Sequence, residues 1–332
     1  MIRSRTVKRL ILALLLALPV WAAKTLDIYF VDVEGGQATL LVSPAGESLL
    51  VDTGWPGFDG RDAERIVAAA KKAGIKKIDY VLTTHYHTDH VGGIKQLADR
   101  MPIGTLVDHG PNQEKGANPD KLWAMYQEVL AKTKRLVVKP GDKIPVKGLQ
   151  VEVLTADGNI TSRKGDPNPL CQGAERRAED PTENARSLGT LITFGKFKFL
   201  DLGDLTWNKE LDLVCPVNRI GKVDVYLTTH HGMDASGPAA LVHAISPKVA
   251  IMNNGEKKGG APPAWKIIKS TPGLQDLWQT HHSAAGGTES NVDEAMIANP
   301  KGTDAGHYLM LQAESNGKFT VTNSRNGNKK SY

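Results

Sequence analysis

Cysteine and aromatic residues are scarce in this sequence. Only two of its 332 residues are cysteine, and 6% are Phe, Trp or Tyr. Two thiols exclude a disulfide-rich scaffold and a cysteine zinc cluster, because neither Cys171 nor Cys215 has another Cys or His at ligand spacing. The sequence leaves open whether these two cysteines form one disulfide or remain free thiols.

A strong charge of one sign is absent as well. The chain has 41 Lys and Arg against 36 Asp and Glu, a net charge of +5, and four of the basic residues lie within the first 22. Without those four, 37 basic residues stand against 36 acidic ones, whereas nucleic-acid binding usually requires a strongly basic face. The lysine pairs at 71–72, 76–77 and 257–258 are interpreted as solvated surface. Nucleic acid therefore stays a possible partner that the net charge does not support.

Long apolar runs are missing, except near the N-terminus. Residues 10–18 form one such run, between a basic segment and the small-residue segment 19–23. This pattern is typical of a secretory signal peptide cut after Ala22. A retained membrane anchor is the alternative, although the run is short for the roughly 20 residues that span a bilayer. We therefore expect a signal peptide at 1–22, no integral membrane segment after its removal, and a secreted or periplasmic protein.

The remaining sequence predicts one α/β domain over residues 23–332. Its apolar patterning alternates between the strand and helix periods. The polar stretch at 157–183 has no apolar period, and we interpret it as an insertion into that domain. Strands are expected at 26–33, 38–42, 47–51, 78–83 and 104–107, with helices at 62–73, 91–100 and 121–132.

Histidine is concentrated in one short segment. Three of the ten histidines, His85, His87 and His90, fall within six residues together with Asp89, just after an apolar run that reads as a buried strand. A strand end that opens into a loop can turn these side chains toward one point. Because imidazole and carboxylate are the ligands of catalytic zinc sites, the segment predicts a metal centre.

This segment also resembles the signature of the metallo-β-lactamase superfamily, His-x-His-x-Asp-His followed by Gly92 and Gly93. Segment 50–54 is similar to the aspartate-bearing turn that precedes this signature in that superfamily, and segments 201–205 and 228–232 are similar to its later motifs, in the same order. Segments 31–40 and 184–188 resemble the hydrolase domain of ComEC-like competence proteins, and we expect this chain to be a secreted form of that domain without the channel. The resemblance implies a four-layer αβ/βα sandwich. In agreement, residues 79–85 (DYVLTTH) and 224–230 (DVYLTTH) are nearly identical, which indicates two similar halves.

The resemblance also implies the roles of single residues. It assigns His85 and His87 to one metal, assigns Asp89, His90 and His230 to a second, and makes Asp204 the bridge between them. The repeated heptapeptide favours His230 over His231 as the late ligand, which leaves His231 as a supporting or substrate-binding group. Asp52 is expected to orient ligands, with a simple turn as the alternative. Asp204 could instead cap a helix that starts near Trp207. Asp89 and Asp204 are the predicted catalytic residues.

One position departs from the superfamily pattern. Asn184 stands where most of these hydrolases have a further histidine, and an amide is a poor zinc ligand. The predicted cofactor is therefore one or two Zn²⁺ ions, with Mn²⁺ as the alternative for an oxygen-rich site. His109 and His282, each at the end of an expected strand, are candidates for the substrate pocket.

Together, these features predict a secreted hydrolase that uses a metal-bound hydroxide. Phosphodiesters, in nucleic acid or an envelope polymer, are the favoured substrates. One alternative is hydrolysis of a lactone, β-lactam or thioester. The other is a non-catalytic module that binds a metal or a substrate, because a fold does not fix its chemistry.

Overall fold

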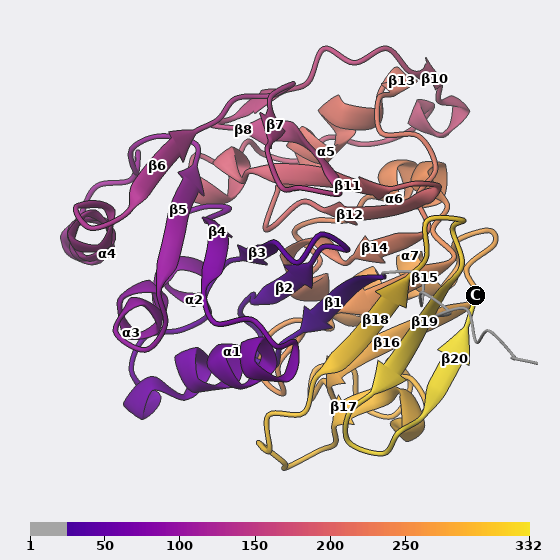
Figure 1. The fold of residues 1–332 in the computed structure, drawn as a ribbon. Helices are drawn as coiled ribbons and strands as arrows, with labels where there is room; N and C mark the ends of the chain where they lie inside the picture. The colour runs from indigo at the N-terminus through magenta and orange to yellow at the C-terminus, as the bar shows by residue number, and fades with distance from the viewer. Residues whose placement is uncertain (1–24) are drawn as a thin grey trace, which may run out of the picture.

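The computed structural model describes residues 25–332, and the signal peptide predicted at 1–22 lies outside that range. Two β-sheets of nine strands each form the centre of the described part (Figure 1). The first sheet has the order β20-β19-β18-β1-β2-β3-β4-β5-β6. Its strands are β1 (Leu26–Phe30), β2 (Thr39–Val42), β3 (Ser48–Val51), β4 (Ile78–Leu82), β5 (Ile103–Asp108), β6 (Lys134–Val137), β18 (Leu309–Ala313), β19 (Phe319–Asn323) and β20 (Lys329–Ser331).

The second sheet has the order β17-β16-β15-β14-β12-β11-β8-β7, and β9 pairs with β8. Its strands are β7 (Lys143–Ile144), β8 (Gln150–Ala156), β9 (Asn159–Ile160), β11 (Gly189–Phe194), β12 (Phe197–Asp201), β14 (Val225–Leu227), β15 (Val249–Met252), β16 (Asp276–His281) and β17 (Ile297–Asn299). A separate ribbon pairs β10 (Asp166–Pro167) with β13 (Val217–Asn218).

Helices cover the outer face of each sheet (Figure 1). The α-helices are α1 (Arg61–Lys72), α2 (Thr88–Val91), α3 (Ile94–Ala98), α4 (Ala117–Leu130), α5 (Trp207–Val214), α6 (Ala239–Ile245) and α7 (Pro262–Lys269). The short 3₁₀ turns are η1 (Phe58–Gly60), η2 (Pro169–Cys171), η3 (Glu183–Arg186), η4 (Thr229–Gly232) and η5 (Glu294–Met296). Among residues 25–332, no helix is both long and apolar enough to cross a membrane.

Three buried clusters hold these layers together. The central one lies between the sheets, where Phe30 of β1 meets Phe199 of β12 with ring centroids 5.8 Å apart. A second packs α1, α3 and α4 on the first sheet through residues such as Ile66 and Tyr126. A third packs α5, α6 and α7 on the second sheet through residues such as Leu241. The order helix, sheet, sheet, helix confirms the predicted four-layer αβ/βα sandwich.

The two similar heptapeptides occupy equivalent places. The first forms β4, which pairs in parallel with β3 and β5, and the second forms β14, which pairs in parallel with β12 and β15. Each therefore lies in the parallel part of its sheet, and each strand is followed by two threonines and then a histidine. The pseudo-duplicated halves bring His85 and His230 to the same edge of the sandwich.

Local boundaries differ from the sequence predictions at two helices. The segment expected as one helix at 91–100 is divided into α2 and α3 around Gly92 and Gly93, where a Cβ on Gly93 would lie 2.1 Å from the carbonyl oxygen of Thr53. Helix α4 begins at Ala117, before the start expected at residue 121, because Pro119 is tolerated in the first turn of a helix.

The polar insertion is attached to the second half of the domain. Cys171 and Cys215 form a disulfide, with their Cα atoms 5.6 Å apart, which answers the question that the sequence left open. The side chain of Asn168 donates to the carbonyl oxygens of Val214 and Ala240 at 3.1 and 3.0 Å. The insertion therefore lies against α5 and α6 through both covalent and hydrogen bonds.

A buried carboxyl on α5 predicts a pH-dependent stability. Burial raises the pKa of Glu210 to about 8, and its Oε2 accepts a hydrogen bond of 2.6 Å from the N–H of Gly237. Below about pH 4.5 both folded and unfolded states hold the proton, so the contribution of Glu210 to stability is complete. Between about pH 4.5 and about pH 8, Glu210 loses its proton in the unfolded state but keeps it in the folded state. The free energy of unfolding therefore falls by at most about 1.4 kcal/mol per pH unit as the pH rises through this range.

Glu210→Gln, which copies the protonated acid, is expected to remove this part of the pH dependence. Thermal unfolding of both proteins at pH 5 and pH 8 measures the effect. The wild type should lose more stability than the variant between these two values. Equal losses in the two proteins would show that Glu210 does not hold its proton in the folded state.

Candidate metal centre

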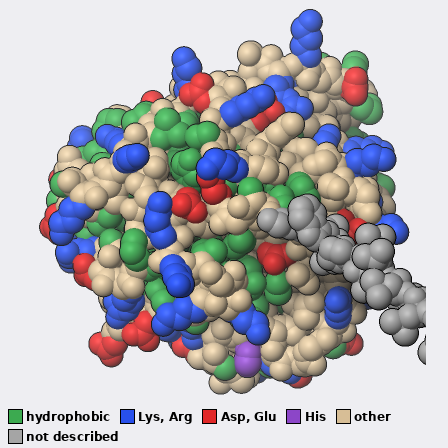
Figure 2. Space-filling model, viewed as in Figure 1, with side chains coloured by type: hydrophobic (Ala, Val, Ile, Leu, Met, Phe, Trp, Pro, Cys, Tyr) green, Lys and Arg blue, Asp and Glu red, His purple; other side chains and the backbone are tan. Residues whose placement is uncertain are grey.

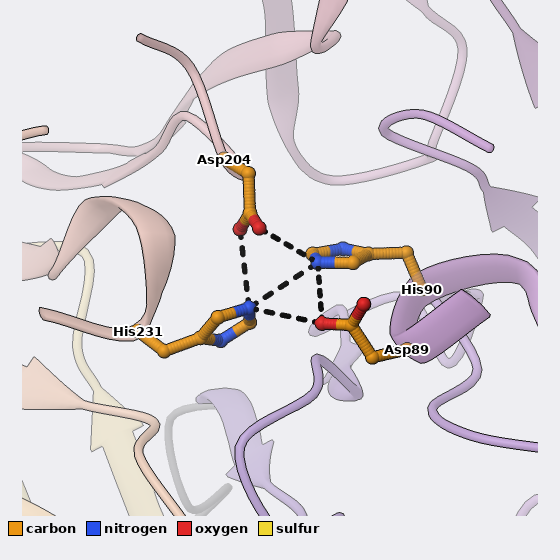
Figure 3. A group of neighbouring side chains, drawn as sticks. All are labelled: Asp89, His90, Asp204 and His231. Atoms are coloured by element: carbon orange, nitrogen blue, oxygen red, sulfur yellow. Dashed lines mark hydrogen bonds and ion pairs between the residues drawn. The ribbon is translucent and has the colours of Figure 1, made fainter. Parts of the chain in front are cut away.

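Four side chains from both halves of the domain converge on one point (Figure 3). Asp89 and His90 lie on α2, Asp204 follows β12, and His231 lies in η4. One ligand atom from each lies within 4.8 Å of the others, and all four residues are buried. This group, Asp89, His90, Asp204 and His231, is called the first cluster below.

Asp204 stands between two imidazoles. Its Oδ1 lies 3.2 Å from Nε2 of His231, and its Oδ2 lies 3.2 Å from Nε2 of His90. The two Nε2 atoms are themselves only 3.2 Å apart. Asp89 closes the group, with its Oδ2 at 3.2 Å from His90 and 3.3 Å from His231.

Electrostatics within the first cluster keep both carboxylates charged. Burial alone would raise the pKa of Asp204, but the imidazoles of His231 and His90 hold it well below its usual range. The pKa of Asp89 is likewise well below its usual range, since His90, His231 and Lys258 outweigh its burial. Burial opposes the charge of His90, yet Asp204, Asp89 and Asp52 raise its pKa well above the ordinary value. The two charged carboxylates are therefore the groups of this cluster that a cation would neutralise.

The donor set fits a divalent cation. Oδ1 of Asp204 and Nε2 of the neighbouring His85 are buried without a hydrogen-bond partner among residues 25–332. Burial, with a contribution from His90, lowers the pKa of His85 well below its ordinary value, so this imidazole is neutral. Buried polar atoms without partners are costly in the absence of a ligand. Neutral imidazole and charged carboxylate are zinc ligands, and they also suit manganese.

Asp52 supports the first cluster from behind. Its Oδ2 lies 2.7 Å from Nδ1 of His90 and accepts from the hydroxyl of Thr84 at 2.7 Å, while its Oδ1 accepts from the N–H of Thr84 at 2.8 Å. Because Nδ1 of His90 is engaged by this carboxylate, Nε2 faces the cluster. The expected role of Asp52 as an orienting group thus has a direct structural basis.

The two histidines of the 228–232 segment lie in a strained stretch of backbone. His230 and His231 have φ values of 56° and 55°, in the left-handed region that residues with a side chain rarely adopt. Such conformations cost about 1–3 kcal/mol each and persist where the surroundings enforce them. The strain turns His231 into the first cluster, while Nε2 of His230 lies 3.4 Å from Oδ2 of Asp204.

The sequence repeat favoured His230 as the late ligand, whereas the geometry favours His231. The physical reason is the left-handed turn at the end of β14, which has no counterpart at His85 after β4. Residues that occupy equivalent positions in the two heptapeptides therefore need not point the same way. Asp89, His90 and Asp204 come together as the resemblance implied.

The other predicted ligands lie around this group. His85 packs against His90, with ring centroids 4.1 Å apart, and its Nδ1 lies 3.0 Å from the hydroxyl of Thr84. Nε2 of His87 is directed to Glu114 Oε1 at 3.1 Å. Asn184 lies in η3, and its Oδ1 is buried without a partner in the described chain. A separate metal at His85 and His87 stays a prediction.

The predicted pocket histidines are placed differently from one another. His109 is buried, and its Nε2 lies 3.0 Å from Oε2 of Glu183, so this side chain is engaged away from the first cluster. His282 follows β16, and its N–H donates to the carbonyl oxygen of Asn299 at 3.0 Å. Their roles in a substrate pocket stay predictions.

Sequence reasoning missed one cationic residue at the site. Lys258 was interpreted as solvated surface, but its Nζ contacts Oδ2 of Asp89 and lies 5.4 Å from the ring centroid of Trp55. Two adjacent lysines in a glycine-rich loop did not indicate that one of them would contact a predicted metal ligand. The loop approaches so closely that a Cβ on Gly259 would lie 2.3 Å from the carbonyl oxygen of His231.

Comparisons with known proteins show which sequence family and relatives the chain is similar to. Residues 31–170 match the sequence family described as "Metallo-beta-lactamase superfamily". The chain is similar to ComE operon protein 3 of Bacillus subtilis, with 23% identity over 73% of this chain and 30% of that protein. It is also similar to Competence protein ComA of Neisseria gonorrhoeae, with 24% identity over 67% of this chain and 26% of that protein.

A further similarity is to a hydroxyacylglutathione hydrolase of Rhodopseudomonas palustris, with 34% identity over 31% of this chain and 33% of that protein. The chain therefore spans about a third or less of the length of each of these relatives. The family match and the competence-protein relatives confirm the resemblance that the motifs suggested.

Proposed function

We propose that this chain, which carries a metallo-β-lactamase domain and belongs with the metal-dependent hydrolases of that superfamily, cleaves phosphodiester bonds. When bound, a divalent cation supplies a Lewis acid and lowers the pKa of water. Zn²⁺, with Mn²⁺ as the alternative, suits the donor set, as one or two ions. Asp89, His90, Asp204 and His231 would hold it, and Asp52 would keep His90 oriented.

The observation that carries the phosphodiester proposal is a cavity next to the first cluster. It has a volume of about 500 Å³ and is lined by Glu34, Trp55, Phe58, Arg61, Glu256, Lys257 and Lys258. Three cationic side chains thus face two acidic ones, and two aromatic rings lie among them. Such a surface suits a substrate that joins an anionic phosphate to a planar or apolar group.

Two of the cations have capacity to bind an anion. Nη2 of Arg61 is buried without a hydrogen-bond partner in the described chain, and its guanidinium lies 4.6 Å from the ring centroid of Phe58. Lys258 contacts Asp89, a proposed metal ligand. Once a cation occupies that carboxylate, the ammonium group is available for a phosphate oxygen. A neutral lactone would gain much less from these two groups.

Lys258→Met is expected to raise KM for a phosphodiester by about 10- to 100-fold with a smaller change in kcat. A hydrogen bond to a charged group contributes about 1.5–3 kcal/mol, and each 1.4 kcal/mol is a factor of ten. Lys269→Met is the matched control, because Lys269 also lies over a tryptophan ring, that of Trp265, at 5.8 Å but on α7. Unchanged KM in Lys258→Met would remove this residue from substrate binding.

A substrate panel tests the proposed function itself. Protein loaded with Zn²⁺ or with Mn²⁺ is assayed on bis-p-nitrophenyl phosphate, single-stranded DNA, a lactone and a β-lactam. We expect turnover of the phosphodiesters. Turnover of the lactone or β-lactam alone would select the carbonyl-hydrolase alternative, and bound metal without turnover of any substrate would select the non-catalytic module.

We further propose that the protein acts outside the cytoplasm, as a secreted or periplasmic enzyme. The apolar run at 10–18 and the Cys171–Cys215 disulfide support this location, since structural disulfides persist in oxidising compartments. Nucleic acid is a less favoured substrate than a small or envelope-derived phosphodiester. Figure 2 shows Lys and Arg interspersed with Asp and Glu over the face in view, without a continuous basic surface.

A further inference from the structure

A second group of metal-type side chains lies outside the first cluster and shares no residue with it. Asp32 and Glu34 follow β1, His281 ends β16, and Asp304 lies in the loop between β17 and β18. One ligand atom from each lies within 4.8 Å of the others. This group, Asp32, Glu34, His281 and Asp304, is called the second cluster below.

His281 is the residue that points to a ligand. Only 1% of it is exposed, and its Nε2 lies 2.9 Å from Oδ1 of Asp32 and 3.2 Å from Oε1 of Glu34. Despite these short distances, Nε2 has no hydrogen bond with suitable geometry among residues 25–332. A buried polar atom without a partner costs about 1–3 kcal/mol. The nitrogen is thus aimed among carboxylate oxygens that lie at ion-pair distance, without a hydrogen bond of suitable geometry to either of them in the described chain.

The first cluster shows the same arrangement. There, Nε2 of His231 lies 3.2 Å from Oδ1 of Asp204, and that oxygen is also buried without a hydrogen-bond partner in the described chain. A metal ion lies about 2 Å from each of its ligand atoms. An imidazole nitrogen and a carboxylate oxygen that both coordinate the same ion are therefore expected about 3 Å apart, without a hydrogen bond between them. The second cluster repeats this spacing in an independent place.

Charge in the second cluster also leaves room for a cation. Arg65 Nη1 binds Oδ2 of Asp32 at 2.8 Å, and the same guanidinium contacts Asp304. Arg61 Nη1 lies 3.5 Å from the other oxygen of Asp304. Three carboxylates and one imidazole therefore lie beside two guanidinium groups, and Oδ1 of Asp32, which accepts the N–H of Glu34 at 3.1 Å, lies 2.9 Å from Nε2 of His281.

We propose that the second cluster binds a divalent transition-metal ion through Asp32, Glu34, His281 and Asp304. One imidazole with three carboxylates suits Mn²⁺ or Zn²⁺ better than Ca²⁺ or Mg²⁺, which take oxygen ligands. The ion joins β1 of the first sheet to β16 of the second.

The ion also braces the segment that leads to the first cluster. Two residues beyond Glu34, Gly36 packs so closely that a Cβ would lie 2.4 Å from the carbonyl oxygen of Asp89. The next residue, Gln37, donates its N–H to that same oxygen at 3.1 Å. The inference does not depend on the substrate proposed above, because it concerns only what these side chains bind.

Metal stoichiometry in a protein whose first cluster is disabled tests this inference. The chain with Asp204→Asn and His231→Ala is titrated with Mn²⁺, and free Mn²⁺ is followed by electron paramagnetic resonance. We expect one bound Mn²⁺ per chain, and its loss when His281→Ala is added. Adding His243→Ala instead is the matched control, because Nε2 of that half-buried histidine lies 3.1 Å from the carbonyl oxygen of Ile267 and outside both clusters.

A second variant guards against a folding defect. Asp304 is 49% exposed, so Asp304→Asn in the otherwise wild-type chain should fold normally while weakening one Mn²⁺ site by about tenfold or more. Circular dichroism and thermal unfolding check the fold of each protein. No bound Mn²⁺ after disabling the first cluster, or binding that His281→Ala and Asp304→Asn leave unchanged, would overturn the inference and leave His281 as an imidazolium paired with Asp32 and Glu34.

Discussion

Asp204→Asn is expected to lower phosphodiester turnover by on the order of 10³-fold and to reduce the metal bound at the first cluster. Asp204 is the one side chain of this group whose two oxygens face different imidazoles, His231 and His90. Asparagine keeps the shape but removes the charge and turns one oxygen into a donor. The same change would therefore weaken a bound cation and the electrostatic stabilisation of the reaction.

The measurement combines metal content and initial rates on bis-p-nitrophenyl phosphate in the same preparation. Asp212→Asn on α5 is the matched control, because the side chain of Asp212 accepts a hydrogen bond from Arg176 at the surface. The control should keep full metal content and rate. Wild-type turnover in Asp204→Asn would contradict the assignment of this carboxylate to the active centre.

Asp52→Ala is expected to destabilise the fold by about 3–5 kcal/mol and to weaken metal binding by about 10- to 100-fold. Asp52 is completely buried and receives hydrogen bonds from the backbone and the hydroxyl of Thr84 while it engages Nδ1 of His90. Alanine would leave these donors buried without an acceptor. Its φ of 61° adds a further cost, since alanine rarely adopts that conformation.

Chemical denaturation and metal titration measure the two effects separately. Asp52→Asn is the informative second variant, because it retains an acceptor for Thr84 and removes the charge beside His90. We expect it to recover most of the stability and little of the metal affinity. If Asp52→Ala binds metal as tightly as the wild type, Asp52 has only a structural role.

Much of this centre could be predicted from the sequence, because short segments carried the information. The strand that ends before His85 and the spacing of Asp89 and His90 are local properties of one segment. The near-identity of residues 79–85 and 224–230 predicted two equivalent strands, and β4 and β14 are those strands. Local patterns of this kind are visible without any knowledge of tertiary contacts.

The rest depends on contacts between distant segments. Lys258 reaches Asp89 across 169 positions of the sequence, and the glycine-rich loop that carries it has no periodicity to interpret. Glu183 engages His109 across 74 positions, in a polar insertion that we could only describe by its composition. The position of His231 beside Asp89 and Asp204 follows from two left-handed residues, which no local propensity predicts.

The most direct test of the central claim is to follow bound metal and phosphodiester turnover together during reconstitution. The chain is stripped with a chelator and titrated with Zn²⁺, and separately with Mn²⁺, beside Asp204→Asn. We predict that the wild type binds metal that Asp204→Asn does not bind. Turnover of bis-p-nitrophenyl phosphate should rise in proportion to this additional bound metal. Turnover in the metal-free chain, or a filled first cluster without turnover, would contradict the account.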